Sequence, residues 1–264
     1  MSRAVGVFDS GVGGLTVVKE LIRQLPHENI VYFGDTARVP YGIKSKETII
    51  RFSIENILFL LKQDVKLICV ACNTVSSIAL PVIRNHFKVP IVGVIAPGAR
   101  EAVYATKNKR IGVIGTKATI LSRAYEKEIN SLDAKIRVIS QPCPLFVPFV
   151  EEGWINERAV LDVAKAYLEP LRKAGIDTII LGCTHYPLLK PVIKKVMGGG
   201  VNLIDSAKQV ATEVKQILTH DGLLASCRRP ERSFYVSDGP GWFSGLAKRF
   251  LGHSIKNVTK VSLS

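Results

Sequence analysis

The chain has 264 residues, of which 47% are hydrophobic and 22% are charged, with a formal net charge of +14. This length and composition suffice for one large or two modest α/β domains with a buried core, and exclude a disordered chain. The positive charge raises the possibility of a polyanionic partner such as nucleic acid, but the basic residues form only short groups spread along the chain. A solvated basic surface is therefore the expected interpretation.

Short apolar runs alternate with helical patterns along the chain. An opening strand is predicted at 5–9, and further strands at 29–33, 67–71, 91–94, 110–115, 136–140, 178–182, 201–204 and 234–237. Helices are predicted at 15–25, 46–62, 125–132, 157–174 and 207–220, with Ser45 and Asp205 as N-caps. This alternation predicts βαβ units and an α/β fold with mainly parallel sheets.

The expected location is the cytoplasm. No charge-free run reaches the length of a transmembrane helix, and residues 1–3 lead directly into a strand instead of a signal peptide. The chain has five cysteines, and an odd number fits reduced thiols better than a disulfide framework.

Two cysteines stand in equivalent places, each directly after a predicted strand. Cys72 follows the run at 67–71 and Cys183 follows the run at 178–182, and small polar residues that can begin a helix come next. At such a position, helix amides and the positive end of the helix dipole favour the thiolate, which acts as a base or nucleophile. A matched pair predicts acid/base chemistry on both faces of one carbon, as inversion requires.

The remaining cysteines have simpler interpretations. We expect Cys69, inside the strand, and Cys227, beside two arginines, to be small buried apolar residues, while Cys143 stays undecided. Cys69 and Cys72 have the spacing of a redox pair, but residues three apart in a strand point to opposite faces, so a dithiol is not expected. No second cysteine pair or closely spaced histidine pair completes a zinc site, so no metal is predicted.

The chain contains a weak internal duplication. Residues 5–10 and 111–116 share an apolar-to-polar form, and one of the two cysteines follows each segment at a similar distance. We therefore predict two similar lobes related by a pseudo-twofold axis. The active site is expected between them, because domain interfaces and the carboxyl ends of parallel strands commonly bind ligands.

A glycine-rich segment at 11–14 connects the first strand to the first helix. It lacks the spacing of a dinucleotide fingerprint and has no Walker lysine. The backbone amides at this helix start can hold a carboxylate, and the simpler alternative is a tight strand-to-helix turn.

Four short motifs carry a resemblance to a known family. They read Phe-Asp-Ser-Gly-Val-Gly-Gly-Leu at 8–15, Asp-Thr-Ala-Arg-Val-Pro-Tyr-Gly at 35–42, Ala-Cys-Asn-Thr at 71–74 and Leu-Gly-Cys-Thr-His-Tyr-Pro at 181–187. Together and in this order they resemble the glutamate racemases of the aspartate/glutamate racemase family. The resemblance extends from about residue 5 to residue 206, so it covers most of the chain.

The resemblance implies an isomerase that interconverts L- and D-glutamate without a cofactor and supplies D-glutamate for peptidoglycan. It implies that Cys72 and Cys183 are the two acid/base groups, assisted by Asp9 and His185, respectively. The substrate contacts that it implies are Asp9, Ser10, Tyr41, Gly42, Asn73, Thr74, Thr184 and His185, and Asp35 and Glu151 are additional candidates.

The resemblance also implies how the chain is divided. Residues 1–97 together with 207–264 are expected to form one lobe and residues 98–206 the other, because the C-terminal segment of the family returns to the first lobe. Members of the family are commonly homodimers, so a homodimer is expected.

Two alternatives stay open at this point. One is a related two-cysteine racemase that acts on aspartate or a hydantoin. The other is a basic protein that binds nucleic acid or another protein, either beside catalysis or in place of it, and the net charge is its main support. The intact pair of cysteines and their polar neighbours argue against a lost active site, and the Thr-His-Tyr sequence at 184–186 and the loop at 41–42 favour glutamate as the substrate.

Overall fold

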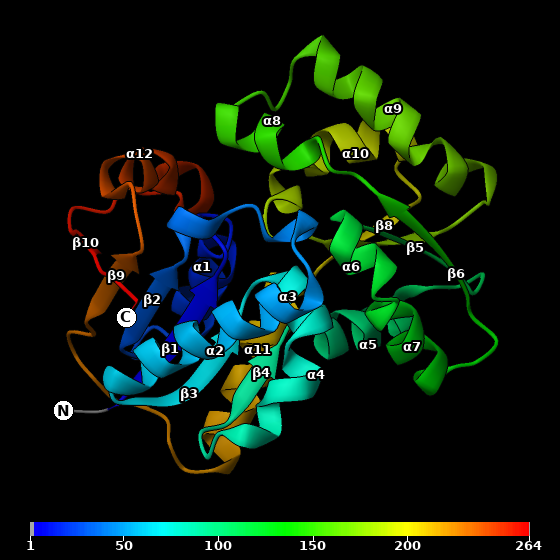
Figure 1. Cartoon of the computed structure of the whole chain (residues 1–264). Helices are drawn as coiled ribbons and strands as arrows, with labels where there is room; N and C mark the ends of the chain where they lie inside the picture. Colours follow the sequence, from blue (N-terminus) through cyan, green and yellow to red (C-terminus); the bar gives the residue numbers. More distant parts are fainter. Residues whose placement is uncertain (1–2, 264) are drawn as a thin grey trace.

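The computed structural model describes residues 3–263, which form two parallel β-sheets with helices on their faces (Figure 1). The first sheet has the strand order β10-β9-β2-β1-β3-β4. Its strands are β1 (Ala4–Asp9), β2 (Ile30–Gly34), β3 (Val65–Val70), β4 (Ile91–Gly93), β9 (Arg232–Val236) and β10 (Val258–Lys260). The second sheet, β6-β5-β7-β8, contains β5 (Arg110–Gly115), β6 (Arg137–Pro142), β7 (Thr178–Gly182) and β8 (Asn202–Asp205).

The helices connect these strands as crossovers. They are α1 (Leu15–Gln24), α2 (Lys46–Lys62), α3 (Asn73–Ile78), α4 (Leu80–Ile83), α5 (Ile95–Ala105), α6 (Lys117–Leu121), α7 (Ala124–Leu132), α8 (Phe146–Glu152), α9 (Arg158–Lys173), α10 (Lys190–Met197), α11 (Ser206–His220) and α12 (Pro240–Leu251). Short 3₁₀ turns lie at Thr36–Arg38, Tyr41–Ile43, Arg84–His86 and Tyr186–Leu189. Both predicted N-caps are confirmed: Ser45 accepts from the backbone N–H of Thr48, and Asp205 from that of Ala207.

The two sheets repeat one strand order, which confirms the predicted duplication. The order β2-β1-β3-β4 in the first sheet corresponds to β6-β5-β7-β8 in the second. Cys72 follows β3 and Cys183 follows β7, the third strand of each repeat. The repeat therefore brings both cysteines to the carboxyl ends of their sheets.

The largest hydrophobic core runs from one lobe into the other. It includes Leu15 of α1, Ile114 of β5, Val210 of α11 and Phe250 of α12, all buried. The central strands β1, β3 and β7 are buried along their whole length, which explains their mainly apolar runs, whereas β6 at the sheet edge is partly exposed. This shared core joins the two sheets on the side of α1 and α11.

The C-terminal segment adds two strands to the first sheet. The predicted strand at 234–237 is observed as β9, whereas β10 and α12 were not expected from the sequence. In Figure 1 this orange and red segment lies beside the blue N-terminal elements. The lobe boundaries at 97/98 and 206/207 stay a prediction. Within residues 3–263, every helix is too short or too polar to cross a lipid bilayer.

Candidate active site

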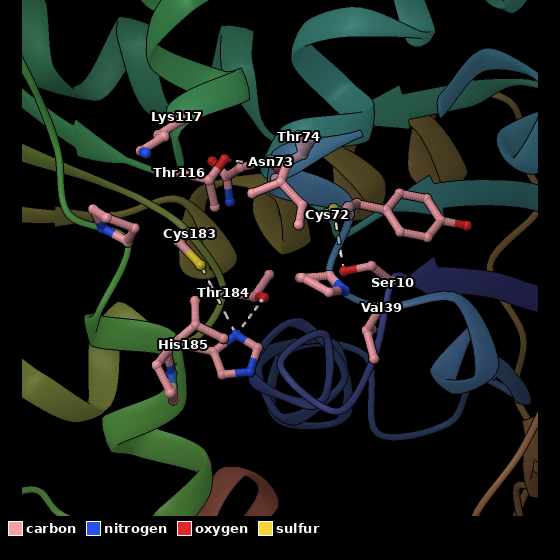
Figure 2. A pocket seen from close by; sticks show the side chains of 18 of the residues that line it. Ser10, Val39, Cys72, Asn73, Thr74, Thr116, Lys117, Cys183, Thr184 and His185 are labelled. Atoms are coloured by element: carbon pink, nitrogen blue, oxygen red, sulfur yellow. Dashed lines mark hydrogen bonds between the residues drawn. The ribbon is translucent and has the colours of Figure 1, made fainter. Parts of the chain in front are cut away.

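Cys72 and Cys183 face one cavity between the carboxyl ends of the two sheets. Figure 2 shows the two thiols approaching this cavity from different lobes. The cavity has a volume of about 370 Å³, and its wall includes both cysteines. The two residues are only 5% and 7% exposed, so each thiol is withdrawn from bulk solvent. The prediction that the site lies between the lobes is confirmed.

Cys72 is held as a neutral thiol. It occupies the N-cap position of α3, and its Sγ lies 3.7 Å from the hydroxyl of Ser10. Burial, together with the charge of Asp9, raises the pKa of the Cys72 thiol to about 12, although hydrogen bonds from the Val75 amide and the Ser10 hydroxyl lower it. The amide of Val75 at the start of α3 lowers this pKa, as expected for a helix start, but burial and Asp9 outweigh it. At neutral pH this thiol is a proton donor.

Asp9 lies behind the cavity wall instead of in it. Its side chain is fully buried, and its Oδ2 accepts a hydrogen bond of 3.1 Å from the backbone N–H of Gly11. Burial raises the pKa of the Asp9 carboxyl, and the nearby His185 lowers it. Its Oδ1 has no hydrogen-bond partner among the described residues. An unpartnered buried acceptor of this kind is costly and is commonly reserved for a ligand or a proton.

Cys183 is paired with a histidine and a carboxylate. Its Sγ lies 3.9 Å from His185 Nδ1, and His185 Nε2 lies 2.9 Å from Glu151 Oε1 (Figure 2 shows the first pair). Burial lowers the pKa of His185, but the interactions with Cys183 and Glu151 outweigh it and raise that pKa to about 10. A protonated imidazole thus stands beside Cys183, and none stands beside Cys72. The two thiols occupy different electrostatic environments.

Glycines allow the two halves of the site to approach closely. A Cβ built on Gly13 would overlap the Oγ1 of Thr184 and lie 2.5 Å from Nδ1 of His185. A Cβ on Gly42 would lie 2.7 Å from the Cβ of Thr116 in the second repeat. The glycine-rich turn is therefore a close-packed joint between lobes as well as a strand-to-helix connection.

Hydroxyl and amide groups complete the cavity wall. Thr74 and Thr116 share a hydrogen bond of 3.0 Å between the lobes, and Thr116 also contacts Thr119 at 3.0 Å. The Oδ1 of Asn73 accepts a 2.7 Å hydrogen bond from Tyr125, while its Nδ2 is buried with no partner among the described residues. Asn73 thus has a free donor at the end of α3 from which Cys72 projects.

The structure brings most of the predicted site residues together. The cavity is lined by Ser10, Tyr41, Gly42, Cys72, Asn73, Thr74, Glu151, Cys183, Thr184 and His185. Asp35 does not line it. It is fully buried and binds Arg38 Nε at 2.6 Å and the hydroxyl groups of Tyr41 and Ser237. The Tyr41 hydroxyl is consequently directed to Asp35, and Asp35 supports the 35–42 loop from behind.

Several lining residues were missed from the sequence. They are Gly11, Val39, Pro40, Ile43, Thr116, Lys117, Pro144, Val147, Pro148 and Gly182. Thr116 could have been found, because it follows β5 as Ser10 follows β1 in the internal repeat. The apolar residues of α8 carry no comparable signal. Among the other cysteines, Cys69 and Cys143 are buried, whereas Cys227 is only half-buried and does not match its prediction.

Asp9→Asn is expected to speed alkylation of Cys72. Removing the negative charge of Asp9 lowers the pKa of the Cys72 thiol, so more thiolate is present at any pH below that pKa. The rate of iodoacetamide modification at Cys72, followed by peptide mass mapping at pH 8, should increase severalfold. Asp64→Asn is the matched control, since Asp64 is an exposed carboxylate immediately before β3. An unchanged rate in Asp9→Asn would contradict this electrostatic assignment.

Together, these features define a class of enzyme. Two thiols face a small cavity from two similar α/β lobes, which is a geometry for moving a proton on and off both faces of one carbon. Among the described residues, no group of three or more His, Cys, Asp or Glu side chains is arranged to hold a metal ion.

Comparison with known proteins identifies the family. The model of the Asp/Glu/Hydantoin racemase family matches residues 5–214, and the chain belongs to this family. It is 50% identical to the glutamate racemase of Geobacter metallireducens over 262 residues, covering 99% of this chain and 97% of that protein. The predicted resemblance is thus confirmed.

Solved structures show the same relationship. A glutamate racemase of Bacillus anthracis matches with a TM-score of 0.96 at 44% identity, covering 99% of this chain and 98% of that one. The glutamate racemase of Francisella tularensis in complex with D-glutamate matches with a TM-score of 0.94 at 42% identity, with the same coverage. An aspartate racemase of Picrophilus torridus, at 18% identity and a TM-score of 0.58, shares the fold.

Proposed function

We propose that this protein is a glutamate racemase that interconverts L- and D-glutamate by two thiols, Cys72 and Cys183. The observation that carries the proposal is the placement of the two thiols on one cavity between the repeats. Relatives that are named glutamate racemase are 45–50% identical over nearly the whole chain, which supports glutamate over aspartate or a hydantoin.

The proposed substrate position places the α-carbon between the two sulfur atoms. One cysteine, as a thiolate, removes the α-proton, and the other, as a thiol, gives a proton to the opposite face. Each turnover therefore converts a thiolate and a thiol into a thiol and a thiolate, with no net gain or loss of protons. Reaction of the opposite enantiomer starts from this exchanged state.

The α-proton is far less acidic than a thiol, whose ordinary pKa is about 8.5, so the developing negative charge must be stabilised. We propose that Ser10, Asn73, Thr74 and Thr184 bind the substrate carboxylates and supply these donors, together with the 41–42 loop. The unpartnered Nδ2 of Asn73 supports this role. We add Thr116 to this set because it also lines the cavity.

Asp9 and His185 are proposed to assist the thiol on their own side. The charge of Asp9 keeps Cys72 protonated until substrate binds, and its free Oδ1 is available to accept a proton or a hydrogen bond. His185, held by Glu151, presents a cation to the sulfur of Cys183. The different surroundings allow one thiol to be the acid while the other is the base.

Further proposals concern the protein in the cell. We propose that it supplies D-glutamate for peptidoglycan, as the resemblance implies, and that it forms a homodimer. We also propose that it acts in the cytoplasm, because the mechanism needs free thiols and a reducing compartment maintains them.

Incubation of the purified protein with single amino acid enantiomers tests the proposed function. L-glutamate and D-glutamate should each be converted to a racemic mixture without added pyridoxal phosphate. Circular dichroism follows the loss of optical activity. L-aspartate should remain optically unchanged under the same conditions. Racemisation of aspartate but not of glutamate would show that the protein is an aspartate racemase. No change in either amino acid would refute a racemase of acidic amino acids.

A further inference from the structure

Helix α12 of the C-terminal segment reaches the second repeat at the end of α8. The Nη1 of Arg249 donates to the backbone carbonyl oxygens of Glu151 at 2.7 Å and Val150 at 3.4 Å. These carbonyls belong to the last turn of α8, where helix carbonyls have no partner within the helix. A cation at this end also interacts favourably with the helix dipole. Arg249 therefore caps α8 from the opposite lobe.

Gly153 makes room for this cap. It follows α8 with a φ of +84°, the left-handed conformation that ends many helices. A Cβ on Gly153 would overlap the Arg249 guanidinium group and lie 2.7 Å from its Cζ. The guanidinium thus packs directly on the glycine backbone. A side chain at position 153 would displace it.

The capped helix carries the carboxylate that holds His185. The side chain of Glu151 contacts His185 Nε2 at 2.9 Å, while the carbonyl of the same residue accepts from Arg249. The next residue of α12, Phe250, packs edge-on against the imidazole, with ring centroids 5.4 Å apart at 83°. Two consecutive residues of α12 therefore fix the partner of Cys183, one through Glu151 and one through the ring.

We propose that Arg249 is a positioning residue for the Cys183 half of the reaction, acting through the last turn of α8 on Glu151 and His185. This inference rests on the proposed function. Arg249 lies outside the cavity wall and does not touch the reacting atoms. Its role is to hold the Glu151 carboxylate where it orients the imidazole toward the sulfur of Cys183.

The test uses a constraint on racemases. Because the two enantiomers of glutamate have equal free energy in water, kcat/KM must be the same in both directions, so a loss at one thiol appears in both. The primary isotope effects with α-deuterated L- and D-glutamate separate the two thiols. Slowing the Cys183 step raises the isotope effect on kcat/KM for the enantiomer whose deuteron Cys183 removes, and lowers it for the other enantiomer.

Arg249→Ala is expected to lower kcat/KM about tenfold in both directions and to move the two isotope effects apart. Arg249→Lys should lie between this variant and wild type, since lysine keeps the charge but loses the planar set of donors. It also serves as the test protein if Arg249→Ala does not fold. Lys248→Ala is the matched control, because it removes a cation from the neighbouring exposed position of α12. This variant should behave like wild type.

The inference is overturned if Arg249→Ala has the kcat/KM of wild type, if the two isotope effects change together, or if Lys248→Ala causes the same loss. Wild-type protein is assayed first. Its failure to racemise glutamate would refute the proposed function, whereas an active wild type with an unaffected Arg249 variant would refute only the positioning role.

Discussion

Replacing either Cys72 or Cys183 with alanine is expected to lower the racemisation of glutamate about a thousandfold or more. General acid/base groups contribute about 10²- to 10⁴-fold each, and the proposed reaction needs both thiols in every turnover. Because kcat/KM is equal in the two directions, each single variant should lose activity toward L- and D-glutamate alike. The measurement is the initial rate of change in circular dichroism with each enantiomer.

Cys69→Ala supplies a matched control for the cysteine variants. Cys69 lies in β3, three residues before Cys72, and belongs to the interior core instead of the cavity wall. Its substitution should lower the melting temperature modestly through lost packing and leave kcat/KM near the wild-type value. Appreciable activity in either Cys72→Ala or Cys183→Ala would contradict the assignment of two essential thiols.

Gly13→Ala is expected to lower kcat/KM at least about a hundredfold. The added methyl group would overlap the hydroxyl of Thr184 and press on His185, so the lobes must separate or the imidazole must move away from Cys183. A displacement of about 1 Å is enough for a loss of this size when reacting groups must be aligned. Steady-state kinetics with L-glutamate measures the effect, and the melting temperature should fall as well.

The same substitution at Gly245 distinguishes this steric effect from a general cost of replacing glycine. Gly245 is an exposed position inside α12, where an added Cβ meets no atom within 4 Å. Gly245→Ala should keep full activity and raise stability by up to about 1 kcal/mol, because alanine favours helix. Wild-type kinetics in Gly13→Ala would show that the close packing at Gly13 does not position His185.

The sequence predicted the elements whose signals are local. The helix Lys46–Lys62 was predicted with its observed bounds, because Ser45 is a strong cap and the apolar period is clear. Both cysteines were placed at strand ends by the apolar runs before them. Their meeting in one cavity followed from the duplication, which the repeated strand order confirms.

Features that depend on tertiary packing were not predicted. The raised pKa of Cys72 comes from burial and from Asp9, and the helix-start rule considers neither. The contacts of Arg249 and Phe250 with the site join segments about 65 to 100 positions apart, and no local pattern marks them. Asp35 resembled a site residue because it lies in a motif, but its charge is used to anchor the 35–42 loop.

Deuterium incorporation from D₂O tests the central claim most directly. Protein is incubated with L-glutamate in D₂O, the reaction is stopped at low conversion, and the two enantiomers are separated and analysed by mass spectrometry. Two thiols on opposite faces predict that the D-glutamate formed carries α-deuterium while the recovered L-glutamate remains protiated. Equal early deuteration of both enantiomers would indicate one base serving both faces, and would contradict the roles assigned to Cys72 and Cys183.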